Sequence, residues 1–125
     1  MKELFFVGSG GFIGSVLRYF LSQYIQSKPE SGFPYGTLAV NIIGCFIIGI
    51  VYALFSRGEI TNDWKLFLAT GICGGFTTFS AFSNEMLLLF KSGNITEAVI
   101  YLTVSIVAGI LATLSAYLLI KAIVL

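Results

Sequence analysis

The sequence predicts an all-helical membrane protein with four transmembrane helices, and three observations support this. The chain of 125 residues is 57% hydrophobic and only 10% charged, whereas about a quarter of the residues in a soluble domain are charged. The few charged residues divide the chain into four long apolar stretches. Each stretch has the roughly 20 residues that a helix needs to cross the hydrocarbon core of a bilayer. A soluble globular fold is therefore excluded.

The four stretches place the helices in order along the chain. The first, 4–27, contains one charge, Arg18, and the stretches 31–56, 66–84 and 98–120 contain none. From these stretches and their flanking residues we expect the following helices: 4–27, 34–56, 64–91 and 96–123. The connections between them are short, and they leave no room for a further domain. The residues 1–125 therefore form one four-helix transmembrane domain.

Turn and cap residues support the two later connections. Arg57-Gly58 follows the second helix and Gly93-Asn94 precedes the fourth, as is typical of turns. Either Thr61 or Asp63 can cap the third helix. The first apolar stretch lacks the small-residue cleavage site of a signal peptide, so we expect it to remain as a helix.

Composition also excludes several classes of function. The chain has no histidine and only two cysteines, Cys45 and Cys73, so it offers no set of four zinc ligands and no histidine-assisted nucleophile. We therefore expect that it is not an enzyme. Net charge is +1 without a basic cluster, which argues against nucleic acid as a partner.

An even number of helices places both ends of the chain on one side of the membrane. Lysine and arginine residues then divide four against two or three, depending on where Arg18 is counted. The side of the termini holds Lys2, Arg57, Lys65 and Lys121, and the other side holds Lys28 and Lys91. This weak bias puts the termini in the cytoplasm, and it is small enough to allow insertion in both orientations.

Polar residues inside the expected helices are the candidates for function. Arg18 lies in the first helix, Asn41 in the second, and Tyr101 and Ser105 in the fourth. Such residues usually face a bundle interior or an aqueous cavity. A single serine or threonine can instead bond to its own helix or hold two helices together. For the group as a whole we favour the cavity.

The third expected helix has the densest polar cluster, 70–83, with Gly71, Gly74, Gly75, Thr77 and Thr78 inside it. Glycine weakens a helix, and hydroxyl groups can satisfy the backbone groups that are freed. We therefore expect a break in this helix, where carbonyl groups can bind a cation. The alternative is a straight helix that packs through Gly71 and Gly75.

Phe79 and Phe82 are three residues apart and so share one face of the third helix. Aromatic rings have electropositive edges. Together with hydroxyl groups and the amide of Asn41, these edges can coordinate a small anion. The alternative is that both rings only fill the core.

Two further features concern the end of the polar cluster and the packing of the helices. Glu85 follows the cluster, where it can lie at a pore mouth or cap a helical segment, and both interpretations stay open. Small residues four apart, such as Gly10 and Gly14 or Ser105 and Gly109, predict close helix packing.

The sequence resembles the Fluc (CrcB-type) fluoride channels in three motifs that occur in the family's order. They are 10–19 (GGFIGSVLRY), 36–46 (GTLAVNIIGCF) and 70–83 (TGICGGFTTFSAFS) followed by Glu85. The resemblance covers nearly the whole chain, including its four-helix size. It departs from the family pattern at Ala81, where a threonine is more usual.

The resemblance implies an antiparallel homodimer with dual topology, two fluoride pathways and one structural sodium ion at the dimer interface. It assigns the fluoride pathway to six residues: Asn41, Phe79, Phe82, Ser83, Tyr101 and Ser105. It assigns the sodium ion to the backbone carbonyls of Gly74 and Thr77, on the expectation that both lie in the break. Arg18 and Glu85 would be vestibule or structural charges.

The leading hypothesis is therefore a fluoride-selective channel of the bacterial inner membrane that exports fluoride passively and confers fluoride resistance. Its partners would be the fluoride ion, the lipid bilayer and a second copy of itself. A small four-helix proton-coupled drug exporter is the alternative, although it needs a carboxylate deep in the membrane. An accessory subunit without transport is a third class, and it would not need the polar cluster.

Overall fold

The structure, a computed structural model, describes residues 1–26 and 32–123. These residues are helical apart from short connections. Along the chain the helices are α1 (Lys2–Gln26), α2 (Tyr35–Ser56), α3 (Asn62–Lys65), the π-helix η1 (Leu66–Cys73), α4 (Gly74–Phe76), α5 (Phe79–Lys91) and α6 (Ile95–Ile123). The expected end of the first helix at residue 27, and most of the expected connection 28–34, lie outside the described residues.

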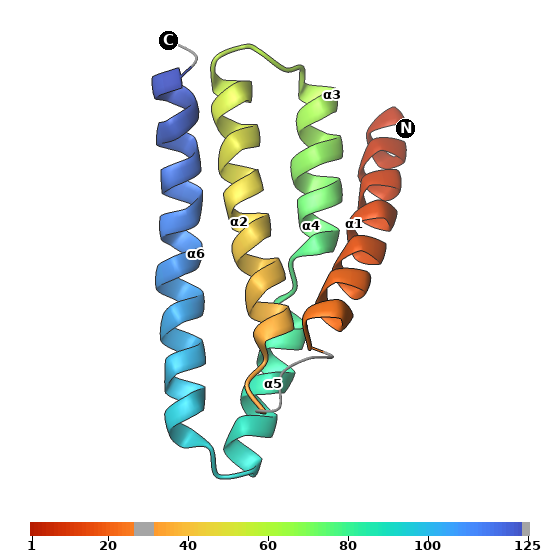
Figure 1. Cartoon of the computed structure of the whole chain (residues 1–125). Helices are drawn as coiled ribbons and strands as arrows, with labels where there is room; N and C mark the ends of the chain where they lie inside the picture. Colours follow the sequence, from red (N-terminus) through yellow and green to blue (C-terminus); the bar gives the residue numbers. More distant parts are fainter. Residues whose placement is uncertain (27–31, 124–125) are drawn as a thin grey trace.

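Four spans are long and apolar enough to cross a membrane: Lys2–Gln26, Tyr35–Ser56, Asn62–Lys91 and Ile95–Ile123. The prediction of an all-helical chain with four membrane-spanning helices is therefore confirmed. The third span consists of α3, η1, α4 and α5 in succession. Figure 1 shows α6, α2 and the upper half of the third span side by side, with both ends of the chain at the same end of the bundle.

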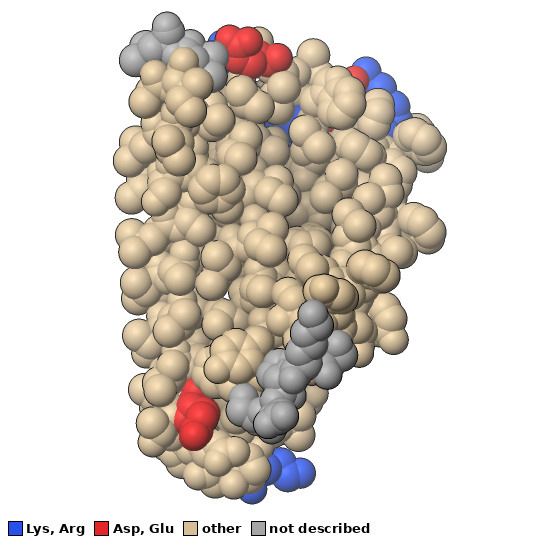
Figure 2. Space-filling model, viewed as in Figure 1, with Lys and Arg blue, Asp and Glu red and all other residues tan. Residues whose placement is uncertain are grey.

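On the face that Figure 2 shows, charged side chains gather at the two ends of the molecule, and the surface between them is uncharged. Large apolar side chains on α1 and α6, such as Phe12, Phe20, Ile110 and Leu118, are exposed. An exposed apolar surface of this extent suits contact with lipid or with another protein.

The turns and the helix cap form where glycine and threonine predict them. Gly58 and Gly93 have φ angles of +76° and +79°, which only glycine adopts at little cost. Thr61 is the N-cap of α3, since its hydroxyl accepts a hydrogen bond from the backbone N–H of Trp64 at 3.3 Å. The sequence allowed Thr61 or Asp63 as the cap, and the structure has Thr61.

Glycines hold α1 directly against the third span. A Cβ atom added to Gly10 would lie 2.5 Å from the carbonyl oxygen of Phe67, and one added to Gly75 would lie 2.6 Å from that of Gly11. Gly14 and Gly71 are equally short of space. The close packing predicted from Gly10 and Gly14 is thus confirmed, and it meets Gly71 and Gly75 on the other helix.

The helix α4 ends at Phe76, and the last helical hydrogen bond of this part of the span runs from the N–H of Thr77 to the carbonyl of Cys73 at 2.9 Å. Thr77 (φ −88°, ψ 155°) and Thr78 (φ −150°, ψ 119°) have extended backbones, and α5 begins at Phe79. We call these two residues the Thr77–Thr78 segment. The expectation that Gly74 is also non-helical is wrong, because its φ and ψ are −61° and −38°. Helical geometry persists through the glycines because Gly71 and Gly75 are packed on α1.

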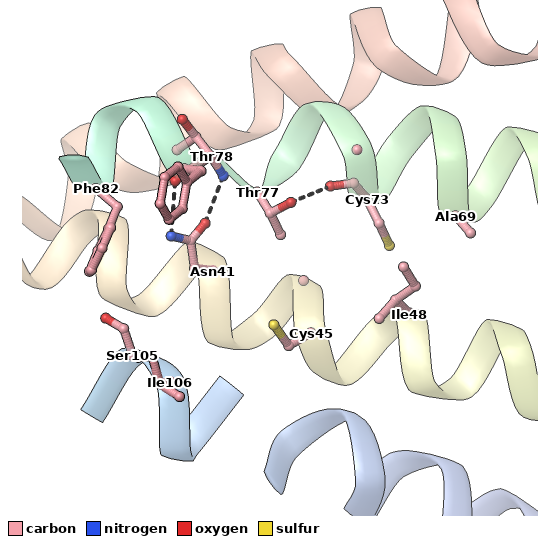
Figure 3. A pocket seen from close by; sticks show the side chains of 13 residues that line it. Asn41, Cys45, Ile48, Ala69, Cys73, Thr77, Thr78, Phe82, Ser105 and Ile106 are labelled. Atoms are coloured by element: carbon pink, nitrogen blue, oxygen red, sulfur yellow. Dashed lines mark hydrogen bonds between the residues drawn. The ribbon is translucent and has the colours of Figure 1, made fainter. Parts of the chain in front are cut away.

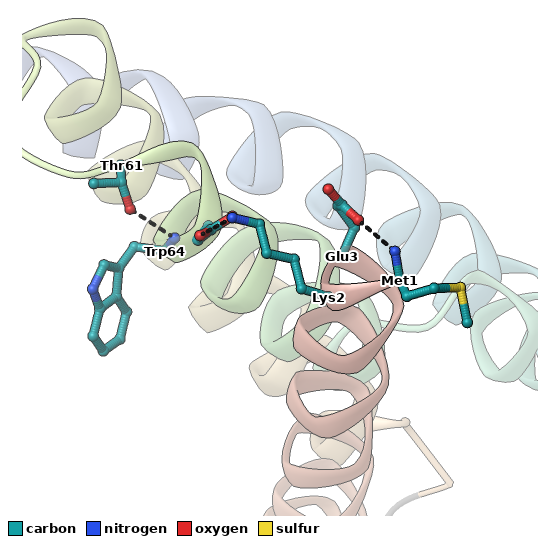
Figure 4. Close-up of polar contacts among 6 residues, drawn as sticks. Met1, Lys2, Glu3, Thr61 and Trp64 are labelled. Atoms are coloured by element: carbon teal, nitrogen blue, oxygen red, sulfur yellow. Dashed lines mark hydrogen bonds and ion pairs between the residues drawn. The ribbon is translucent and has the colours of Figure 1, made fainter.

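The N-terminal end of α1 contacts the start of α3, as Figure 4 shows. The ammonium group of Lys2 lies 3.3 Å from the carboxylate of Asp63, and both side chains are partly exposed. Exposed ion pairs contribute little to stability. The glycine contacts further along α1, rather than this pair, therefore fix its position.

Candidate functional site

A cavity of about 380 Å³ lies between α2, the third span and α6. Figure 3 shows its residues, which come from all three spans and surround the Thr77–Thr78 segment. It brings together six of the residues singled out in the sequence: Asn41, Gly74, Thr77, Phe79, Phe82 and Ser105. Thr78, which the sequence pattern did not assign to a site, also lines it.

Asn41 of α2 binds the backbone of Thr78 through both ends of its amide. The N–H of Thr78 donates to Oδ1 of Asn41 at 2.8 Å, and Nδ2 of Asn41 donates to the carbonyl oxygen of Thr78 at 3.2 Å. Both bonds are drawn in Figure 3. The amide thus replaces the partners that a helix would have given to Thr78, and it fixes the extended backbone to α2.

Thr78 also caps the helix that follows it. Its hydroxyl accepts a hydrogen bond from the backbone N–H of Ala81 at 3.1 Å. This is the usual contact of a threonine N-cap. Because the contact uses the backbone of Ala81, it does not depend on the side chain at this position.

These two contacts leave two carbonyl groups without their helical donors. In an uninterrupted α-helix the N–H of Thr78 would donate to Gly74, and that of Ala81 would donate to Thr77. Side chains of Asn41 and Thr78 accept these N–H groups instead. Gly74 and Thr77, the two residues expected to bind a cation, are the ones whose carbonyls are released in this way.

Arg18 supplies the partner of a third carbonyl at the end of α4. Its Nε donates to the carbonyl oxygen of Gly75 at 3.0 Å, from α1 to the third span. The guanidinium group is half-buried. Arg18 therefore joins α1 to the third span through a hydrogen bond. Its role as a vestibule or structural charge stays a prediction.

The two phenylalanines differ in their surroundings, although their ring centroids are only 5.6 Å apart. Phe79 is 79% exposed, whereas Phe82 is 8% exposed and lies 4.9 Å from the ring of Tyr101. Phe82 is thus part of the packed core as well as of the cavity wall. Phe79 projects from the chain, where a second protein surface can reach it.

The hydroxyl group of Ser105 is buried, and no hydrogen-bond partner for it exists among the described residues. Buried polar groups nearly always have a partner, and one without calls for an explanation. Ser105 lines the cavity. Its free hydroxyl is available to a ligand there.

Glu85 lies in the middle of α5, where it accepts two hydrogen bonds from other spans. The hydroxyl of Thr37 on α2 donates to it at 2.7 Å, and that of Tyr101 on α6 donates at 2.8 Å. The interpretation of Glu85 as a helix cap is therefore wrong. Thr37 was missed in the sequence because its only signal is a hydroxyl group among many.

The network of Glu85, Thr37 and Tyr101 lies beside the cavity rather than around it, and Phe82 joins the two through its contact with Tyr101. Ser83 is exposed and does not line the cavity. The structure therefore does not bring Ser83 together with the other residues expected in the fluoride pathway.

Within residues 1–26 and 32–123, no group of three or more histidine, cysteine, aspartate or glutamate side chains could hold a metal ion. Carbonyl oxygens suit a monovalent cation that has lost its hydration shell.

The chain is similar to known proteins over most of its length. The family model described as CrcB-like protein, Camphor Resistance (CrcB), matches residues 5–117. A fluoride-specific ion channel FluC of Phocaeicola vulgatus is 51% identical over 114 residues, which are 91% of this chain and 94% of that protein. The fluoride-specific ion channels FluC of Flavobacterium psychrophilum and Azobacteroides pseudotrichonymphae are 42% and 44% identical. They match 90% and 95% of this chain, and 92% and 96% of their own lengths.

Proposed function

Because the chain belongs to the CrcB-like family, we propose that it is a fluoride-selective channel that lets fluoride leave the cytoplasm by passive electrodiffusion. Its relatives are bacterial proteins named fluoride-specific ion channels, and its four spans are those of a multi-pass inner-membrane protein. The family membership is the single observation on which this proposal depends most.

The cavity supports anion passage by the kind of groups that line it. Phe79, Phe82 and Ser105 meet there, and the described residues around it include no carboxylate. The free hydroxyl of Ser105 can donate a hydrogen bond to fluoride, and the ring edges add weak electropositive contacts. We propose that fluoride passes these groups, and that Tyr101, which is buried against Phe82, continues the polar path.

A second copy of the chain would complete the site. Phe79 is 79% exposed and the cavity opens at the surface of one subunit, so a single copy cannot shield an anion from lipid. We propose an antiparallel homodimer with dual topology. The nearly even division of Lys and Arg residues between the two ends supports insertion in both orientations.

The freed carbonyls of Gly74 and Thr77 support a structural sodium ion. Their helical donors are bound by Asn41 and Thr78, and both residues line the same cavity. Two copies would supply four carbonyl oxygens, with no charged ligand. We propose that the Thr77–Thr78 segment is the functional break of the third helix, and that a sodium ion bound there joins the two subunits.

The proton-coupled exporter is not favoured. Glu85 is the one carboxylate within 66–120 apart from Glu97 at the start of α6, and it already accepts hydrogen bonds from Thr37 and Tyr101. An exporter needs a carboxylate that is free to exchange protons for a cationic drug.

The deciding experiment measures ion efflux from liposomes that contain the purified protein. With a potassium gradient and valinomycin, fluoride should leave rapidly and chloride should not, as read with ion-selective electrodes. Drug uptake driven by a proton gradient, without fluoride efflux, would show that the protein is an exporter and not a channel.

The sodium ion is tested separately. The dimer in detergent should dissociate faster when sodium is replaced by N-methyl-D-glucamine at equal ionic strength.

A further inference from the structure

Two side chains, Asn41 and Thr78, bind the N–H groups that a continuous helix would pair with the carbonyls of Gly74 and Thr77. We infer that Asn41 and Thr78 are positioning residues for the cation site: their side-chain oxygens hold the two carbonyls available without contacting the cation. This inference rests on the proposed sodium site. It assigns to Asn41 a role that does not require contact with fluoride, and it assigns a role to Thr78 for the first time.

The geometry of Asn41 supports this role. Two hydrogen bonds of 2.8 and 3.2 Å join its amide to the N–H and C=O of Thr78. An amide held at both ends cannot turn toward a ligand without releasing the backbone. If it is released, the Thr78 N–H regains access to the Gly74 carbonyl, which is its partner in a continuous helix.

Thr78 acts one turn later by the same principle. Its hydroxyl accepts the N–H of Ala81 at 3.1 Å, and the Ala81 N–H is the helical partner of the Thr77 carbonyl. Without the hydroxyl, that N–H needs another acceptor, since an unpaired N–H is costly in a membrane. The Thr77 carbonyl is the acceptor that helical geometry provides.

The remaining contacts around the Thr77–Thr78 segment belong to other groups. The Gly75 carbonyl is bound by Arg18, and Cys73 accepts both the N–H and the hydroxyl of Thr77 at 2.9 Å. These contacts fix the neighbouring backbone but do not compete for the carbonyls of Gly74 and Thr77. The availability of these two carbonyls therefore depends on Asn41 and Thr78.

The test uses Thr78→Ala and Asn41→Leu, each in the full chain purified in detergent. The measured quantity is the sodium concentration that gives half-maximal protection of the dimer against dissociation, with N-methyl-D-glucamine keeping ionic strength constant. If the binding conformation falls to about a tenth of the population, the half-maximal concentration should rise about tenfold. Thr78→Ser keeps the hydroxyl and should restore the value of the parent.

Thr61→Ala is the matched control. Thr61 is also a threonine N-cap, with its hydroxyl on the N–H of Trp64, but it lies far from the cavity. It should lower the melting temperature as any lost cap does and leave the half-maximal sodium concentration unchanged. A merely structural role of Thr78 would give the same result as Thr61→Ala.

Two outcomes overturn the inference, and they differ. If the parent dimer responds to sodium and both Thr78→Ala and Asn41→Leu respond at the same concentration, the positioning role is wrong and the sodium site stands. If the parent does not distinguish sodium from N-methyl-D-glucamine, the sodium site fails and the positioning role fails with it. Since the two variants change different helices, loss of one to misfolding leaves the other as the test.

Discussion

The two sides of the third span contrast sharply, although both contain glycine. Gly71 and Gly75 lie against α1 with no space for a methyl group, whereas a Cβ atom on Gly74 would meet nothing closer than the carbonyl of Ala69 at 3.8 Å. On the side toward α1, the backbones of the two helices are in direct contact. The side toward the cavity holds carbonyls released from helical bonding. It faces Ser105 of α6, whose hydroxyl has no partner in the described part of the chain.

This difference indicates that the chain separates stability from transport. Tight backbone contact on one side fixes the third span, so that the other side can hold groups with unused hydrogen-bonding capacity. Substitutions toward α1 should therefore affect folding, and substitutions toward the cavity should affect flux. Variants on each side can test this separation, beginning with the largest effect.

The packed side should not tolerate added volume. In Gly75→Val the new side chain would meet the backbone of Gly11, 2.6 Å away, so we expect almost no monodisperse protein. Overpacking typically costs about 1–3 kcal/mol, and here the contact is with backbone, which cannot move aside. Gly74→Ala is the control and should purify in normal yield, as judged by size-exclusion chromatography. Normal yield of Gly75→Val would show that the side of the third span toward α1 is no more tightly packed than the side toward the cavity.

On the cavity side, Asn41→Asp should stop conduction more completely than Asn41→Ala. Aspartate keeps an acceptor for the N–H of Thr78 but loses the amide donor and places a negative charge beside the anion path. We expect fluoride efflux to fall about a hundredfold or more, or about 3 kcal/mol in the barrier. Efflux from liposomes measures this, and equal rates in the aspartate variant and the parent would show that Asn41 lies away from the path.

Substitution of the two phenylalanine rings should affect fluoride flux in both cases but protein stability in only one. Phe79→Ile and Phe82→Ile both remove an electropositive ring edge worth about 1 kcal/mol, so fluoride flux should fall about fivefold in each. Only Phe82→Ile should also lower the melting temperature, because Phe82 is buried against Tyr101 and Phe79 is exposed. If flux is unchanged in both correctly assembled variants, the rings are core filler.

Ser105→Ala should slow transport without a cost in stability. Its hydroxyl has no partner among the described residues, so its removal leaves no protein group unpaired, and the melting temperature should stay the same or rise slightly. Flux should fall about fivefold, the equivalent of a hydrogen bond of ~1 kcal/mol. A large drop in melting temperature would mean that the hydroxyl is structural.

Thr77→Ser should have the smallest effect. Serine keeps the hydroxyl that donates to Cys73, and the proposed cation contact of Thr77 uses the backbone. Flux and sodium dependence should both stay within about twofold of the parent, less than ~0.5 kcal/mol. A marked loss would indicate that the threonine methyl group itself contributes to the site.

Features that depend on local sequence were predicted well. Apolar stretches with at most one charge located the four spans, and Gly58, Gly93 and Thr61 form their turns and cap where their residue types suggested. The close packing of Gly10 and Gly14 followed from their spacing of four residues, whereas its partner, the third span, was not predicted. Local signals suffice here because length and backbone freedom decide these features.

Features that depend on contacts between distant residues were not predicted. The π-helix η1 has no signature in 66–73, and the extended backbone lies at Thr77 and Thr78 rather than at Gly74. The extended backbone is held in this position by Asn41, which lies 37 residues away from Thr78 in the sequence. Likewise, nothing in the sequence pairs Glu85 with Thr37, 48 residues away. Which residues become partners at such distances depends on how the helices pack in three dimensions.

The contact between Arg18 and Gly75 has a consequence for how the protein enters the membrane. Arg18 is synthesised 57 residues before the carbonyl that accepts its hydrogen bond. Until the third span emerges from the ribosome, the first span holds this charge without its partner, at a cost of up to about 2.5–3.5 kcal/mol, the value for a helix centre. We therefore expect the first span to remain near the translocon, or to shift toward the interface, until its partner arrives. The order in which the helices are made is then not the order in which they settle in the bilayer.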